Sequence, residues 1–159
     1  MITVRRAGVL DARQMAELLN AVIKIGGTTA ITEPVQAEDM KSWMQSDNSI
    51  WHVAEDDTGE ILGFQWVEPH EKLPPAATNI ATFAQVGKTG MGIGSSLFRA
   101  TEKAARELGF QWINAEIRAD NEGGLIYYQS RGFEDYARTT GVTLADGQIV
   151  DKIHKRFNL

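Results

Sequence analysis

The sequence contains no cysteine and only three histidines in 159 residues. The lack of cysteine excludes disulfides, thiolate catalysis and zinc-finger chemistry together. His52, His70 and His154 are far apart in the sequence and lack helical ligand spacing, so we expect no metal site. Long apolar runs are missing as well: no segment approaches the ~20 residues that span a bilayer, and the N-terminus has no apolar leader. We therefore expect a cytoplasmic protein with no membrane partner.

A strong charge of one sign is also missing. The formal net charge is −5 and the basic residues are scattered rather than clustered, which argues against nucleic acid as a partner. Apolar residues make up 43% of the chain and charged residues 23%, near the averages for globular proteins. A chain of this length fits one domain, so we expect residues 1–159 to fold as a single domain.

Hydrophobic periodicity predicts the order strand, two helices, three strands, helix, strand, helix and two strands. The expected strands are residues 2–7, 49–56, 60–70, 79–86, 111–118, 133–142 and 148–157. The expected helices are one that begins at Asp11 and is stopped by residues 25–27, and others at 35–45, 95–108 and 121–132. Asp11 with Gln14 has the pattern of a capping box, and DDTG suits a hairpin turn between antiparallel strands. The order predicts one mixed α/β sheet with helices on its faces.

The segment KTGMGIGSSLF, residues 88–98, places three alternating glycines before a predicted helix. Glycines at 90, 92 and 94 allow positive φ and let the backbone approach a ligand without interference from a Cβ. Unpaired N–H groups at the start of the helix, and the helix dipole, favour an anion there. We therefore expect an anion-binding turn, with pyrophosphate as the best candidate and Lys88 as an added charge.

Other glycine-rich motifs share this logic but differ in spacing. The P-loop needs Gly-Lys followed by Ser or Thr, whereas Lys88 precedes the glycines, which excludes a P-loop. The dinucleotide fingerprint needs G-x-G-x-x-G in the first strand-helix unit, whereas G-x-G-x-G here follows several predicted strands. The motif alone does not exclude the alternative that this glycine-rich turn binds no ligand.

Two motifs together resemble the GNAT superfamily of N-acetyltransferases. TGMGIGSSL resembles its acetyl-CoA loop, and NEGGLIYYQSRGF resembles its later motif, an asparagine followed after six residues by tyrosine and then Gly-Phe. They occur in the superfamily's order, separated by one helix and one strand. The resemblance implies the GNAT fold, classed as α/β or α+β: a single mixed, mostly antiparallel sheet of about seven strands flanked by about four helices.

The resemblance implies roles for residues around the glycine loop. The backbone from Thr89 to Ser95 would hold the CoA pyrophosphate, and Asn121 would contact the pantetheine arm or nearby backbone. A backbone N–H near residues 82–84 would polarise the acetyl carbonyl. Thr89 stands where the superfamily has Gln or Arg, which removes a side-chain donor. The expected acetyl-CoA-binding residues are Phe83, Ala84, Lys88, Thr89, Gly90, Met91, Gly92, Ile93, Gly94, Ser95 and Asn121.

The resemblance also implies direct attack by an amine on acetyl-CoA, with Tyr128 as the general acid for the departing thiolate. The neighbouring Tyr127 points another way on a helix and is expected to pack. A weaker resemblance, to the phosphinothricin acetyltransferase and L-amino acid N-acyltransferase branch, is carried by LLNAVIKIGGTTAITEP, GFQWVEPH and Asp151. It implies a small-molecule amine acceptor, such as an amino acid or an amino-acid-like compound.

That branch carries a glutamate where Asn79 stands, and an amide cannot accept a proton as a base. Glu68, His70 and Glu33 are the candidate substitutes, and histidine is the residue type that titrates nearest neutral pH. An amine that enters deprotonated, or loses its proton through a water chain, needs none of them. Trp66 is the tryptophan we expect at an acceptor pocket.

TTA at residues 28–30 lies between the first two predicted helices, where the superfamily places acceptor contacts. Homodimers are common in the superfamily, and these residues leave the oligomeric state open. The alternative is a non-catalytic acyl-CoA-binding or sensory module of the same fold. Asn79 and Thr89 favour that module, whereas Tyr128 and Asn121 favour an enzyme, because a pure binder has little need for an acid aimed at sulfur.

Overall fold

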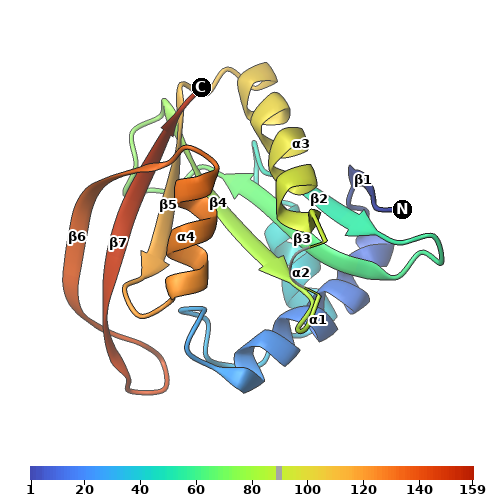
Figure 1. The fold of residues 1–159 in the computed structure, drawn as a ribbon, viewed down its shortest axis with the longest axis horizontal. Helices are drawn as coiled ribbons and strands as arrows, with labels where there is room; N and C mark the ends of the chain where they lie inside the picture. The colour runs from blue at the N-terminus through green and yellow to red at the C-terminus, as the bar shows by residue number, and fades with distance from the viewer. Residues whose placement is uncertain (89–90) are drawn as a thin grey trace.

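The computed structural model describes residues 1–88 and 91–159. Within them, the chain runs through one strand, two α-helices, three strands, a helix, a strand, a helix and two strands, as Figure 1 shows. The elements are β1 (Thr3–Arg6), the 3-10 helix η1 (Val9–Asp11), α1 (Ala12–Ile25), α2 (Ala37–Met44), β2 (Ile50–Glu55), β3 (Ile61–Glu68), β4 (Ala77–Ala84), α3 (Ile93–Glu107), β5 (Trp112–Arg118), α4 (Glu122–Ser130), β6 (Glu134–Thr143) and β7 (Ile149–Asn158).

The strands form one seven-stranded sheet in the order β1-β2-β3-β4-β5-β7-β6. All neighbours are antiparallel except β4 and β5, which are parallel. The β4–β5 pairing covers only Ala77–Ile80 against Trp112–Ala115, although β4 continues to Ala84 and β5 to Arg118. The two central strands therefore part after Ile80, and the edge of β4 beyond that point has no strand partner from β5.

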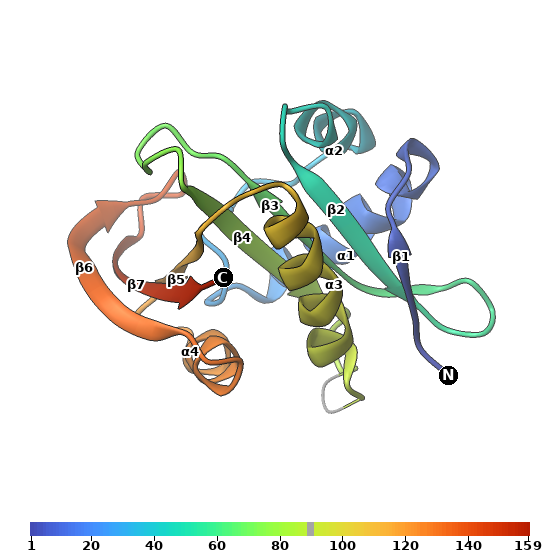
Figure 2. The ribbon, with the colours of Figure 1, turned by 90° about the horizontal axis from the view of Figure 1, so that it is seen from above.

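Helices cover both faces of the sheet. Figure 2 shows α1 and α2 on one side and α3 and α4 on the other. The α1 side is packed by aromatic and aliphatic side chains, among them Phe64 and Met15. Phe98 of α3, Ile113 of β5 and Tyr128 of α4 belong to a cluster on the opposite side. The predicted mixed, mostly antiparallel sheet with four helices is confirmed among the described residues.

The start of α1 differs in detail from the expectation. The helix begins at Ala12, but the Asp11 carboxylate accepts hydrogen bonds from the Gly8 N–H at 2.7 Å and from the Arg5 guanidinium, not from the first turn of α1. Gln14 Oε1 accepts from the Ile61 N–H of β3 at 3.2 Å. The predicted capping box is therefore wrong. The Asp11 carboxylate contacts β1 and the turn that follows it, and the Gln14 amide contacts β3.

Trp66 belongs to the core. Its indole stacks on Trp51 across β2 and β3, with ring centroids 4.0 Å apart, and only 6% of the residue is exposed. Phe64 and Phe83 pack beside it. The expectation that Trp66 lines an acceptor pocket is therefore wrong: alternating apolar residues on β3 bury the indole under α1.

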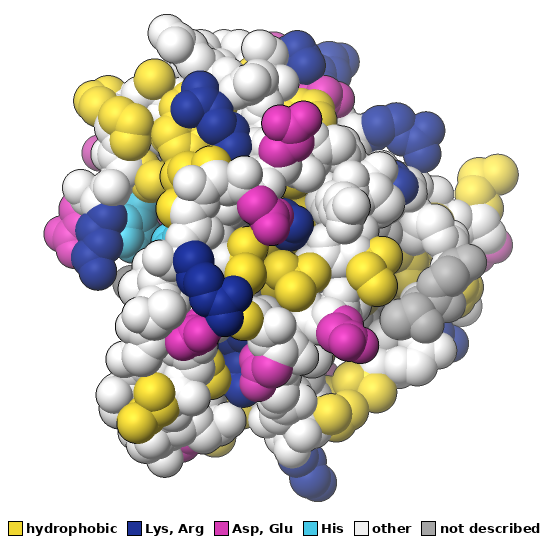
Figure 3. Space-filling view, turned by 60° about the vertical axis from the view of Figure 1, so that its left-hand side comes forward, with side chains coloured by type: hydrophobic (Ala, Val, Ile, Leu, Met, Phe, Trp, Pro, Cys, Tyr) yellow, Lys and Arg dark blue, Asp and Glu magenta, His cyan; other side chains and the backbone are white. Residues whose placement is uncertain are grey.

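No helix among residues 1–88 and 91–159 is long and apolar enough to cross a membrane. On the side of the molecule that carries β6 and β7, Lys and Arg side chains are interspersed with Asp and Glu (Figure 3). That face therefore presents charges of both signs.

Candidate active site

The next element after β4 is α3, with residues 85–92 between them, and β4 ends beyond the point where β4 and β5 part. Gly92 is the N-cap of α3 and takes φ 78°, a left-handed conformation that glycine adopts without strain. The next glycine, Gly94, makes a close approach: a Cβ there would lie 2.5 Å from the Tyr127 ring. Gly92 thus lets the chain turn into α3, and Gly94 leaves room for Tyr127 of α4 to pack against the first turn of α3.

The expected acetyl-CoA loop surrounds this helix start. Phe83 and Ala84 end β4, and Lys88 follows in an exposed turn. Met91, Ile93 and Ser95 enter α3 on the other side of the turn, whereas Thr89 and Gly90 lie outside the described residues. The first N–H groups of an α-helix have no partner within the helix and carry its positive dipole end. The described part of the loop is thus suited to an anion.

Arg131 brings a further cation to this helix start, and the sequence analysis did not single it out. Its guanidinium, at the end of α4, donates a hydrogen bond to Ser95 Oγ in the first turn of α3. It also lies over the Tyr127 ring, 6.0 Å from the centroid. Arg131 and Tyr127 are four positions apart, a spacing at which helix periodicity predicts contact. Arg131 and Ser95 are 36 positions apart, so their contact could not be predicted in that way.

Tyr128 is the buried residue of α4, with 7% of the residue exposed. Its hydroxyl is 2.8 Å from Thr82 Oγ1, on the part of β4 that has separated from β5. Burial raises the pKa of the Tyr128 phenol, and the hydrogen bond with Thr82 opposes that change. The phenol is therefore neutral over the physiological range and holds a proton next to the parted strands.

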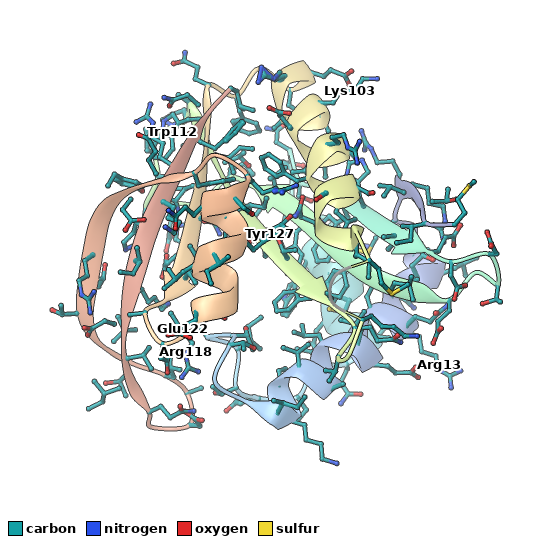
Figure 4. All side chains as sticks on the ribbon, in the orientation of Figure 1. Arg13, Lys103, Trp112, Arg118, Glu122 and Tyr127 are labelled. Carbon is teal, nitrogen blue, oxygen red and sulfur yellow. The ribbon has the colours of Figure 1, made fainter. Side chains whose placement is uncertain are left out.

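Tyr127 does more than pack. Figure 4 shows its side chain between α4 and α3. Its hydroxyl donates to the carbonyl oxygen of Gly94 at 2.7 Å and accepts from Gln65 Nε2 at 3.1 Å. Burial raises the pKa of Tyr127 to about 12. Its side chain links the start of α3 to the middle of β3.

Asn121 is the N-cap of α4. Its Oδ1 accepts from the Gly124 N–H at 3.0 Å, and its Nδ2 donates to the carbonyl oxygen of Thr28 at 3.0 Å. The sequence predicted contact with pantetheine or with nearby backbone, and the structure places the side chain on backbone. Thr28 belongs to the loop between α1 and α2, so Asn121 fastens that loop to the start of α4.

The position of the missing glutamate is occupied by an amide pair. Asn114 Nδ2 donates to Asn79 Oδ1 at 2.9 Å, and the Tyr136 hydroxyl donates to Asn114 Oδ1. Glu68 faces Asn79 across β3 and β4. His70 follows in the next loop, where its Nδ1 accepts from the Lys72 N–H at 3.1 Å.

A pocket of about 210 Å³ opens beside this amide pair. Its lining comes from the loop after β3 and from β4, β5, β6 and β7, and includes His70, Asn79, Asn114, Glu116, Tyr136 and His154. His70 and His154, 84 positions apart in the sequence, therefore line one pocket. Glu33, the third base candidate, is exposed in the loop between α1 and α2.

The sequence pattern of the acetyltransferase (GNAT) family matches residues 19–133, and the chain belongs to that family. It is thus an N-acetyltransferase, of a family whose solved members include complexes with acetyl-CoA. The predicted family membership and enzyme class are confirmed.

The relatives found include phosphinothricin acetyltransferases. Bacillus subtilis YwnH, provisionally assigned to that group, is 26% identical over 154 residues, 94% of each chain. A solved structure with the same provisional assignment is 25% identical, covers 100% of this chain and 99% of its own, and has a TM-score of 0.87. Sinorhizobium meliloti phosphinothricin acetyltransferase, solved with acetyl-CoA, has a TM-score of 0.89 at 19% identity, covering 99% of this chain and 88% of its own.

Proposed function

We propose that this enzyme moves the acetyl group of acetyl-CoA to the primary amine of a small acceptor that also carries a carboxylate, with Tyr128 as general acid. The observation that carries the proposal is the neutral Tyr128 phenol held at the point where β4 and β5 part. Two relatives with sequence identities of 25% and 26% bear provisional names that point to an amino-acid-like acceptor, phosphinothricin.

The residues around the start of α3 fit acetyl-CoA. The first N–H groups of α3 would bind the pyrophosphate. Gly94 has no side chain, so the Tyr127 ring packs against this turn, where a Cβ would lie 2.5 Å from it. Lys88, exposed in the loop before α3, and Arg131, hydrogen-bonded to Ser95 in its first turn, add positive charge. Arg131 would thereby replace the side-chain donor that Thr89 lacks. Asn121 would act indirectly, through the backbone that it holds.

The unpartnered edge of β4 would bind the pantetheine arm, because exposed N–H and C=O groups of a strand edge pair readily with an extended chain carrying amides. A backbone N–H of residues 82–84 would face the acetyl carbonyl and polarise it. Bound acetyl-CoA supplies the activated acyl group, and the chain supplies its position and the proton for its leaving group.

In the chemical step, the acceptor nitrogen forms a bond to the acetyl carbon and the carbon–sulfur bond breaks. Sulfur keeps the electron pair and takes the proton of Tyr128. The acceptor nitrogen loses a proton to a base or to water, and solvent returns a proton to the phenol. His70 is the best placed of the three base candidates, because it lines the pocket with Asn79, while Glu68 flanks Asn79 in the sheet.

The pocket beside Asn79 is our candidate for the acceptor site. It is lined by amides, imidazoles, the Tyr136 ring and Glu116, and Lys72 adds a positive charge for an acceptor carboxylate. Such a mixture binds an amine and a carboxylate better than it binds a purely cationic polyamine.

The experiment is release of CoA thiol from acetyl-CoA with a panel of amino acids, phosphinothricin, polyamines and aminoglycosides, followed by the mass of the acetylated product. We expect turnover with amino acids or phosphinothricin. The alternative, a non-catalytic acyl-CoA-binding or sensory module, is favoured by Asn79, which cannot act as a base. Tight acetyl-CoA binding by calorimetry with no turnover across the panel would support that module and contradict the proposal.

A further inference from the structure

A chain of buried hydrogen bonds leads from α3 to Tyr128. The Tyr127 hydroxyl donates to the Gly94 carbonyl oxygen and accepts from Gln65 Nε2. Gln65 Nε2 also donates to Thr82 Oγ1 at 2.9 Å, and that hydroxyl lies 2.8 Å from the Tyr128 hydroxyl. Gln65 stands in the middle of β3 and is 0% exposed.

The partners fix the orientation of the glutamine amide. A carbonyl oxygen only accepts, so the single hydroxyl hydrogen of Tyr127 is committed to Gly94. Tyr127 has no second hydrogen, so the Gln65 atom that faces it is the nitrogen. Both Nε2 hydrogens are then in use, the second one on Thr82. Gln65 Oε1 is left buried without a hydrogen-bond partner in the described part of the chain.

A buried amide oxygen without a partner destabilises a fold, and an apolar side chain of similar size avoids this loss. Val67, two positions along β3 and therefore on the same face as Gln65, is buried and apolar. Packing therefore does not explain the glutamine, whereas its two donated hydrogen bonds do.

These hydrogen bonds make Thr82 available as a donor. Gln65 occupies one lone pair of Thr82 Oγ1, which polarises the hydroxyl and strengthens the bond that its hydrogen can make to Tyr128. We propose that Gln65 and Thr82 are positioning residues that hold a hydroxyl donor on the Tyr128 oxygen and stabilise the phenolate formed when Tyr128 gives its proton to the CoA sulfur. The inference rests on the proposed function, in which Tyr128 is the general acid.

The balance of the step shows why the donor is needed. As the carbon–sulfur bond breaks, the electron pair passes to sulfur, the Tyr128 proton moves to sulfur, and one negative charge appears on the phenol oxygen. An ordinary phenol has a pKa of about 10 and an ordinary thiol about 8.5, so the transfer is unfavourable even in water. Burial raises the pKa of Tyr128 further, and the Thr82 hydrogen bond lowers it.

The test compares Thr82→Val, which removes the donor and keeps the shape, with Thr82→Ser, which keeps the donor. We expect Thr82→Val to lower kcat by about 10- to 100-fold, with the Kd of acetyl-CoA changed less than about twofold, and Thr82→Ser to recover most of the rate. Gln65→Leu should lower kcat by a smaller factor, while its unfolding midpoint stays at or above that of the wild type.

The same Thr82→Val change is then made in Tyr128→Phe, where no phenol oxygen is present. We expect less than about a twofold further loss of kcat, because residues that act through one group are not additive. An undiminished loss in a slow Tyr128→Phe enzyme would overturn this inference alone. A Tyr128→Phe enzyme with the wild-type kcat would instead contradict the proposed function, and the inference with it.

Discussion

The guanidinium of Arg118 donates a hydrogen bond to the carbonyl oxygen of Thr29 at 3.1 Å and so ties the end of β5 to the loop between α1 and α2. The same guanidinium makes two hydrogen bonds to the Asp120 carboxylate, at 3.0 and 2.8 Å. The Arg118 side chain is 3% exposed (its place at the foot of α4 is labelled in Figure 4). Together with the bond from Asn121 to Thr28, it gives residues 28–30 two anchors.

Replacing Arg118 by Met should loosen this loop and leave the rest of the sheet in place. We expect the free energy of unfolding to fall by about 1–3 kcal/mol, because the buried guanidinium loses its hydrogen bonds to Thr29 and to the partly exposed Asp120 carboxylate. The acceptor KM should rise several-fold while the Kd of acetyl-CoA stays unchanged. Urea unfolding and steady-state kinetics measure both effects.

Arg138 is the matched control, since it also pairs with an aspartate, Asp151, but is half exposed. Arg138→Met should change the free energy of unfolding by less than about 1 kcal/mol. Equal effects of the two substitutions would show that the contacts of Arg118 with the loop have no special importance.

Arg131→Gln tests the cation at the start of α3. Because a charge-assisted contact to phosphate is stronger than a neutral one, we expect the Kd of acetyl-CoA to rise by about 5- to 20-fold, with a smaller salt dependence. Calorimetry measures this without turnover. Arg106→Gln, near the other end of α3, is the control and should leave the Kd unchanged. An unaltered Kd in Arg131→Gln would remove this residue from the acetyl-CoA site.

Gly94→Ala should disturb the contact between α3 and α4. The added Cβ would lie 2.5 Å from the Tyr127 ring, so the ring must move and its hydrogen bonds to Gly94 and Gln65 must lengthen. We expect a loss of about 1–3 kcal/mol in stability together with a lower kcat. Gly123 occupies the corresponding position of α4, and a Cβ there would meet only Asn121 Oδ1, at an ordinary contact distance of 3.9 Å, so Gly123→Ala should be neutral or slightly stabilising by thermal unfolding. A stable, fully active Gly94→Ala would contradict the close packing.

His52 should make stability depend on pH. Burial, with a contribution from Arg6, lowers the pKa of His52 from 6.5 to about 4, so the folded chain keeps a neutral imidazole while the unfolded chain binds a proton below pH 6.5. The unfolded state therefore binds more protons between pH 6.5 and about 4, and the free energy of unfolding falls as the pH is lowered through that window. Urea unfolding of the wild type and of His52→Gln at pH 7.5, 6 and 5 measures the slope. Identical slopes would show that His52 does not cause it.

Hydrophobic periodicity predicted much of the fold because most elements have an apolar face that is buried against the sheet. The helical spacing of Leu97, Phe98 and Ala105 predicted α3, and alternating residues predicted the strand β5. The same pattern misplaced Trp66, because an apolar strand residue next to a functional loop looks the same whether it lines a pocket or the core. Burial among four other aromatic rings is a property of the packed sheet and leaves no local signal.

The site was predictable only where the contacts are local or the motif is specific. The glycine turn and Tyr128 follow from short motifs, whereas Arg131 reaches Ser95 over 36 positions and Arg118 reaches Thr29 over 89. Gln65 gave no signal because one polar residue within an apolar strand is uninformative until its partners are known. Gln65 lies on β3, Arg118 at the end of β5 and Arg131 just after α4, so their contacts form only when distant parts of the chain pack together.

The most direct test of the central claim is kcat for acetyl transfer by Tyr128→Phe, measured beside the Kd of acetyl-CoA by calorimetry. The substitution removes only a hydroxyl, so the ring packing that buries Tyr128 is kept. Our account predicts a kcat lower by about 100-fold or more with a Kd within about twofold of the wild type. A variant that keeps the wild-type kcat would contradict the assignment of Tyr128 as the acid that protonates the departing sulfur.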